Sequence, residues 1–327
     1  MPNKRNPRFG TMQYWPRKRA RRMYPRVRDH NRPKEAKLAG FAGYKVGMTH
    51  VLMEDARSTS PTKGTKISVP VSVIECPPLK VYGVRFYQNM EKGQKVVFEV
   101  NSKTNDKNLK RRLTNQKKFK DKFDDVPEYD ELTLLVYTQP SMTSIGKKKP
   151  DIFEMAVGGS KEEQLQFAKD NLSKDINVTD VLKSGDVTDV HSITTGKGTT
   201  GPVKRFGVSI RNHKSEKVKR GPGSIAGGWK AQGHMMYRVA FAGQMGCHQR
   251  KEYNKWLLKV SDKVDEINPK GGFVRYGLVK NPYILVKGSV NGPSKRLIRF
   301  SNAARAHSKI PEGEPVIKYT SLESNQK

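Results

Sequence analysis

Apolar residues in this chain occur mostly in short β-branched and aromatic runs that Gly, Pro and Asn separate. Four such runs follow residue 40: FAGYKVGMTHVLME, KISVPVSVIEC, KVYGVRFYQ and QKVVFEV. Four more follow residue 254: KWLLKVSD, GFVRYGLV, YILVKGSV and RLIRFSNA. Short runs of this composition between turn residues are typical of antiparallel strands. We therefore predict a mainly β fold, in which residues 38–100 and 255–327 form one closed or nearly closed antiparallel β-barrel.

The segment between the two sets of strands, residues 101–190, has a different composition. ELTLLVYTQ and IFEMAVGG predict strands, and SKEEQLQFAKDNL predicts a helix with Ser160 at its N-cap. Residues 121–190 carry 15 acidic residues against 8 lysines, a net charge of −7 that suits a solvated surface. We expect an α/β insert over residues 101–190. Its basic stretch KTNDKNLKRRLTNQKKFKDKF is compatible with either a helix or a flexible loop.

The charge of the whole chain narrows the choice of partners. Its 327 residues include 63 Lys and Arg against 31 Asp and Glu, a formal net charge of +32. Such a surplus repels itself unless a polyanion surrounds it. We find neither a run of about 18 apolar residues that could span a membrane nor a basic amphipathic helix that could lie on one. Nucleic acid is therefore the favoured partner.

The two cysteines, Cys76 and Cys247, stand far apart and form no CxxC pair. Their number and spacing indicate neither a disulfide framework nor a four-ligand zinc site. Because no secretory signal precedes them, we expect a soluble protein in a reducing compartment, the cytoplasm.

Residues 1–37 form a basic N-terminal arm. It holds 13 Lys and Arg against Asp29 and Glu35, with several prolines and no apolar periodicity. Because such a segment has little apolar surface to bury, we expect it to be extended and ordered only by a partner.

The central segment, residues 196–254, combines glycines and cations with a few large apolar side chains. Its glycines leave little from which to build a core, whereas Trp229, Tyr237 and Phe241 could stack on splayed bases. A disordered, solvated basic loop is the alternative, but disorder usually avoids aromatic residues. We favour a long finger loop that RNA orders.

Enzymatic readings find little support in this segment. GKGTTGPV from Gly196 fits a kinase phosphate loop only formally, because the chain has no catalytic-loop or metal-binding aspartate motif to accompany it. Cys247 beside His248 lacks an orienting carboxylate apart from Glu252, and with His234 it makes an incomplete metal set. We expect no catalytic residue, no metal and no cofactor. An RNA-modifying enzyme and a chromatin-type DNA binder are the weaker alternatives.

Several motifs carry a resemblance to a known family. They are KRFG, GSIAGGW, AGQMGCHQRKEYNKW, GGFVRYG and YILVKGSVNG, together with RFGTMQYWPRKRA and GFAGYKVGMTHV near the start of the chain. These motifs are similar to the archaeal and eukaryotic form of the universal L-three family of large-subunit ribosomal proteins, and they span nearly the whole chain.

The resemblance implies a translation-protein-type β-barrel with an α/β insert, whose arm and finger enter large-subunit rRNA. It implies a structural role in early subunit assembly, a finger tip at Trp229 near the peptidyl transferase centre, and neighbours of the L-fourteen and L-twenty-four-e families. Lys230-Ala231-Gln232 after the tip departs from relatives that have proline there, and Gln244 matches a glutamine that is methylated in bacterial relatives. No membrane or small-molecule substrate is implied.

Charge and resemblance together predict a set of rRNA-binding residues. In the arm they are Lys4, Arg5, Arg8, Trp15, Arg17, Lys18, Arg19, Arg21 and Arg22. In the finger they are Lys204, Arg205, Arg211, Lys219, Arg220, Trp229, Lys230, His234, Arg238, Gln244, His248 and Arg250.

Overall fold

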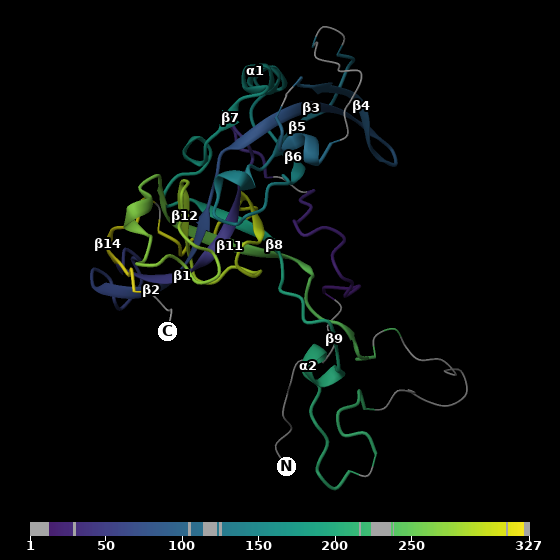
Figure 1. Ribbon diagram of the computed structural model, residues 1–327, viewed down its shortest axis with the longest axis vertical. Helices are drawn as coiled ribbons and strands as arrows, with labels where there is room; N and C mark the ends of the chain where they lie inside the picture. The colour runs from purple at the N-terminus through teal and green to yellow at the C-terminus, as the bar shows by residue number, and fades with distance from the viewer. Residues whose placement is uncertain are drawn as a thin grey trace. The chain divides into compact units, whose positions relative to one another are not determined.

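The computed structural model describes most of the chain, in two compact units (Figure 1). The described residues are 13–28, 31–103, 106–113, 123, 126–215, 217–223, 237, 239–311 and 313–323. Unit 1 comprises Met1–Arg22 and Ile193–Gln249, and unit 2 comprises Met23–Ser192 and Arg250–Lys327. In the described part of the chain, no helix has the length and apolar character needed to cross a membrane.

Unit 2 is built around a closed antiparallel barrel. Its sheet contains β1 (Ala42–Glu54), β2 (Lys66–Glu75), β8 (Val187–Ile193), β11 (Gln249–Ser261), β12 (Tyr283–Lys287), β13 (Leu297–Asn302) and β14 (Ile317–Thr320). The order is β13-β8-β11-β12-β2-β1, and β1 pairs back onto β13 at Ala42, so these strands close a ring. β14 pairs with the other end of β1. The predicted mainly β fold is confirmed.

Burial of β-branched and aromatic side chains stabilises the barrel. Val71 and Val73 of β2 and Leu285 of β12 are completely buried, as is the ring of Tyr283. Burying an aliphatic side chain of this size contributes about 1.5–3 kcal/mol. The pairing of β1 with β2 shifts register between Lys45 and Gly47, where the chain forms a bulge.

A second sheet lies in the same unit and carries most of the helical structure. It has the order β4-β3-β5-β6, with β7 (Asp175–Ile176) paired to β3. The members are β3 (Leu79–Met90), β4 (Gly93–Asn101), β5 (Glu131–Tyr137) and β6 (Ile152–Ala156). Helix α1 (Lys161–Asn171) begins at a capping box in which Ser160 and Glu163 satisfy each other's backbone N–H.

β3 and β4 pair with the expected insert, although they fall within the range that the sequence analysis assigned to the barrel. An alternating apolar run predicts a strand but not the sheet that it joins, so the sequence pattern does not separate the two sets. In the basic stretch upstream of β5, the structure describes a short 3-10 helix, Leu109–Arg111, with Leu109 buried. Residues 114–122 lie outside the described residues.

The expectation that the whole arm is ordered only by a partner is wrong for its second half. Tyr24 and Val27 are buried, and the Tyr24 ring centroid lies 6.2 Å from that of Phe153 on β6. Further along, Leu38 forms a β-bridge with Val157. A few apolar side chains between prolines are enough to fix the segment, because the neighbouring strands supply the rest of the core.

A buried carboxylate organises the loop between β11 and β12. Glu75 is fully buried, and its Oε1 accepts hydrogen bonds from Lys280 N (2.9 Å), Asn281 N (3.0 Å) and Asn281 Nδ2 (2.7 Å). Its Oε2 accepts the phenol proton of Tyr276. These charge-assisted hydrogen bonds offset the free-energy cost of desolvating the carboxylate, and they fix the loop on the barrel.

Buried tyrosines should make the fold sensitive to alkali. Burial raises the pKa of Tyr44, whose hydroxyl donates to Thr138 Oγ1, and burial and then Glu75 raise the pKa of Tyr276. Above about pH 10 the unfolded chain releases phenol protons that the folded chain keeps, so stability falls as pH rises. Each such tyrosine contributes a slope of about 1.4 kcal/mol per pH unit.

The measurement is urea unfolding between pH 8 and 11. We expect Tyr44→Phe to be less stable than the parent at pH 8, because it loses the bond to Thr138, but to show a shallower loss of stability above pH 10. Tyr319→Phe, at an exposed position on β14, is the control, and its free energy of unfolding should depend on pH as that of the parent does. Identical slopes for Tyr44→Phe and the parent would contradict this assignment.

Candidate nucleic-acid interface

The two ends of the finger meet in unit 1 and form a short neck. β9 (Thr199–Thr200) pairs antiparallel with β10 (Gly243–Gln244), and Met245 N donates to Gly198 O at 2.8 Å. Helix α2 (Pro202–Phe206) follows β9 and starts on a proline, which suits the first turn of a helix. It ends at Gly207, whose φ of 71° is the left-handed conformation that glycine adopts without strain.

Arg205 joins the two sides of the neck. Its Nε donates to Gln244 O at 3.0 Å and its Nη1 to Phe241 O at 2.9 Å. A Cβ on Gly243 would lie 2.9 Å from Nη1, so a larger residue there would require the guanidinium to shift. Burial lowers the pKa of Arg205. Arg205 was predicted to bind rRNA, and in the structure two of its donors bond to backbone carbonyls.

The arm docks on the same neck through Phe206. The Trp15 ring stacks on the Phe206 ring with centroids 6.3 Å apart and planes 26° apart. The Arg17 guanidinium carbon lies 4.1 Å from the Phe206 centroid, and Arg17 Nη1 donates to Arg205 O at 2.7 Å. Stacking and cation–π contacts of this kind contribute about 0.5–2 kcal/mol each.

Two further bonds hold the arm to the end of the finger. Lys18 O lies 2.9 Å from His248 Nδ1, and Ala20 N donates to Cys247 O at 2.7 Å. We call the contacts of residues 15–20 with residues 205–206 and 247–248 the arm–neck clasp. The structure therefore brings together Trp15, Arg17, Lys18, Arg205 and His248, which the sequence analysis selected separately. Phe206 was missed as the platform between them, although KRFG sets this one aromatic residue directly after two cations.

Most of the other predicted cations of the arm and finger are exposed. Arg250 is partly buried, and Gln244 Nε2 donates to Met245 O and Gly246 O. The exposed predicted cations are Lys18, Arg19, Arg21, Arg22, Lys204, Arg211, Lys219 and Arg220. The remaining predicted positions lie outside the described residues: Lys4, Arg5, Arg8, Trp229, Lys230, His234 and Arg238.

Within the described residues, the candidates for a nucleophile, a base and metal ligands do not form a catalytic or metal site. Cys247 and His248 are both buried, and Nδ1 of the His248 ring contacts the backbone carbonyl of Lys18. Over the described ranges, no group of three or more His, Cys, Asp or Glu side chains could hold a metal ion.

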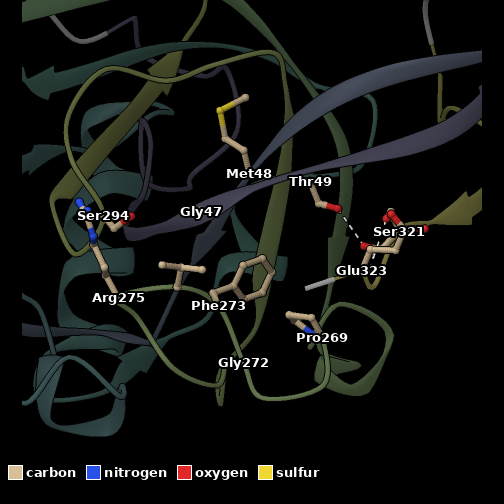
Figure 2. Close-up of a pocket in the computed structure, with 11 residues that line it drawn as sticks. Gly47, Met48, Thr49, Pro269, Gly272, Phe273, Arg275, Ser294, Ser321 and Glu323 are labelled. Atoms are coloured by element: carbon tan, nitrogen blue, oxygen red, sulfur yellow. Dashed lines mark hydrogen bonds between the residues drawn. The ribbon is translucent and has the colours of Figure 1, made fainter. Parts of the chain in front are cut away.

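A hollow on the barrel of about 380 Å³ is lined by β1 and by the loop that Glu75 fixes (Figure 2). Phe273 packs under β1, where a Cβ on Gly47 would lie 3.1 Å from its ring. Arg275 and Glu323 are the charged lining residues, and Thr49 Oγ1 donates to Ser321 O at 2.8 Å. This mixed lining has no cluster of acid and base groups.

A closed barrel, a second α/β sheet and a strongly basic neck define a class of basic barrel proteins that carry extensions suited to a polyanion. A family model described as ribosomal protein L3 matches residues 1–131 and 128–327. The chain belongs to the ribosomal protein L3 family.

Curated relatives agree with this assignment over nearly their whole length. The chain is 45% identical over 341 residues to "Large ribosomal subunit protein uL3" of Methanosphaera stadtmanae, covering 100% of this chain and 99% of that one. It is 43% identical to the protein of the same name in Methanobrevibacter smithii, covering 98% of each chain. The Archaeoglobus fulgidus protein is 44% identical, again over 98% of each. The expected archaeal and eukaryotic type is confirmed.

Disruption of the clasp should release the arm without unfolding the barrel. Arg205→Ala removes two bonds across the neck, and Trp15→Ala removes the stack on Phe206. Each change should lower the free energy of local opening of the arm. For a decrease of about 1.4 kcal/mol, we expect trypsin to cleave after Lys18 and Arg19 about tenfold faster. Lys204→Ala, at the exposed neighbouring position, should leave the cleavage rate unchanged. Equal rates in all these variants would show that the clasp does not hold the arm.

Proposed function

We propose that this chain is a structural constituent of the large ribosomal subunit that binds large-subunit rRNA through its arm and finger. The observation that supports this most is the charge of unit 1. Residues 1–22 and 193–249 hold 18 Lys and Arg against one acidic residue, Glu216, a net +17 of the chain's +32. An RNA backbone can neutralise a charge of this size.

The proposal extends to assembly and position within the subunit. The arm, residues 1–37, and the finger, residues 196–254, enter rRNA early in subunit assembly, and the finger tip at Trp229 approaches the peptidyl transferase centre. The barrel stays in contact with neighbouring proteins of the L-fourteen and L-twenty-four-e families. The chain acts in the cytoplasm as a ribosomal component, with a structural and not a catalytic role. Family membership and the exposed cations of the clasp region support these statements.

RNA affinity should fall steeply with salt. A protein that makes 6–10 phosphate contacts loses roughly 10³–10⁵-fold in affinity between 50 and 200 mM salt. We expect a loss of this size for the full chain on large-subunit rRNA in filter binding. Arg211→Gln and Lys219→Gln, at exposed positions of the finger, should each reduce the slope of log affinity against log salt by about 1. Lys92→Gln, on the turn between β3 and β4, is the control. A flat salt response would exclude phosphate binding as the main source of affinity.

Trp229 should matter for assembly and not for folding. We expect Trp229→Ala to leave the melting temperature of the free protein within about 1 °C, because the proposal assigns Trp229 to rRNA and a substitution outside the core changes stability by less than about 0.5 kcal/mol. Incorporation into large subunits, measured by co-sedimentation in a moderate-salt gradient, should fall. A sharp drop in melting temperature would identify Trp229 as a core residue and contradict the proposal for the tip.

A further inference from the structure

A second hollow in unit 2, of about 570 Å³, has a lining unlike that of the hollow in Figure 2. It lies where the loop after β1, the start of β11, the end of β12 and the segment before β14 meet. Its charged lining residues are Arg57, Lys255, Lys287 and Lys309, with His307 beside them and no carboxylate. A volume of this size is typical of sites that take a small molecule or one unit of a polymer. We call it the barrel pocket.

The positive charges of the barrel pocket are only partly compensated. Arg57 pairs with Asp55 at 2.8 Å, and its hydrogen bonds hold the pKa of Asp55 below the usual range. Lys255 pairs with Glu252 at 2.6 Å. No ion pair involves Lys287 or Lys309 within the ranges that the structure describes. Burial, and next the charge of Arg57, lower the pKa of Lys287, so a bound anion would relieve the repulsion.

Aromatic side chains form the floor and the rim. Trp256 is buried, its indole N–H donates to Gly185 O at 3.1 Å, and Lys287 Nζ lies 5.4 Å from its ring centroid. Tyr253 on the rim is 60% exposed, with Lys251 Nζ 4.7 Å from its ring centroid. An exposed tyrosine ring beside a cation offers a face on which an unstacked base can lie.

A buried carboxylate fixes two sides of the pocket before any ligand enters. Asp189 on β8 is fully buried and accepts hydrogen bonds from Asn254 N at 3.0 Å and Ala304 N at 3.2 Å. The first bond holds Asn254 at a φ of 54°, a conformation that asparagine tolerates, directly after Tyr253. The second anchors the start of the segment that carries His307 and Lys309. A preorganised site binds with a smaller entropic cost.

We propose that the barrel pocket binds an unpaired nucleotide of an RNA strand, with its phosphate at Lys287 and Lys309 and its base stacked on Tyr253. This inference rests on the proposed function and adds to it a contact in unit 2, where Tyr253 lies on β11 at the end of the finger sequence and Lys287 and Lys309 lie outside both the arm and the finger. An acidic peptide would also satisfy the lysines, but it would leave the exposed Tyr253 ring without a planar partner. A double-stranded segment presents no free base face.

Cross-linking to the full chain tests this inference at the level of single residues. The probe is a single-stranded oligouridine that contains 5-iodouridine, added at subsaturating concentration and moderate salt, and cross-linked peptides are identified by mass spectrometry. We expect a cross-link at Tyr253. Lys309→Gln should lower its yield about tenfold, because a bond to a charged group is lost, whereas Lys95→Gln on β4 should not change it. Unlabelled oligouridine should remove the cross-link, and a duplex RNA of the same length should leave most of it.

Each contrary outcome has a distinct meaning. RNA retention without a cross-link at Tyr253, or a cross-link that Lys309→Gln does not weaken, would overturn the inference and leave the proposed function intact. Equal competition by duplex RNA would overturn base stacking and the inference with it. Protection of Lys287 and Lys309 from acetylation by oligoglutamate, but not by oligouridine, would assign the pocket to an acidic protein partner. Failure of the chain to retain RNA at all would overturn the proposed function as well.

Discussion

A buried arginine on β13 joins the two sheets and the N-terminal segment. Arg299 is 2% exposed, and its Nη2 donates to Glu154 O on β6 at 2.6 Å, while the ring of Phe153 lies 4.3 Å from its guanidinium carbon. Its Nη1 points to Pro25 O at 3.5 Å. Burial lowers the pKa of Arg299, which reflects the cost of holding a cation without a carboxylate partner. Backbone carbonyls and an aromatic face offset that cost, so the barrel, the second sheet and the segment after Tyr24 meet where all three contribute to one cation.

The pattern of apolar residues predicts the barrel because short β-branched runs between turn residues are typical of antiparallel strands. It does not assign β3 and β4 to the second sheet, because strands of either sheet show the same alternation. The pattern also does not predict the burial of Tyr24, because one aromatic residue among prolines shows no periodicity. Charge and motif select the residues of the candidate interface, but charge alone does not distinguish Arg205, bound to carbonyls, from Arg211, exposed to solvent. That distinction depends on which backbone atoms lie nearby in the fold.

The two units use the same residue types in different ways. In unit 2 many cations have carboxylate partners: Arg85 bonds to Glu99 at 2.6 Å and also to Glu154, and Lys251 lies 3.1 Å from Asp189. In unit 1 the sequence offers Glu216 alone; among the described cations there, Arg205 bonds to backbone carbonyls, Arg17 lies over the Phe206 ring, and Arg211 is exposed. Unit 1 therefore holds just over half of the net charge of the chain, +17 of +32, with a single acidic residue to oppose 18 cations.

The arm–neck clasp also sets an order of events during synthesis. Arg17 bonds to the carbonyl of Arg205, a residue 188 positions further along the chain. At 5–20 residues per second, roughly 10–40 s separate the synthesis of the two partners. During that interval the neck on which residues 15–20 dock has not yet been made. The clasp can therefore form only after synthesis has passed residue 248.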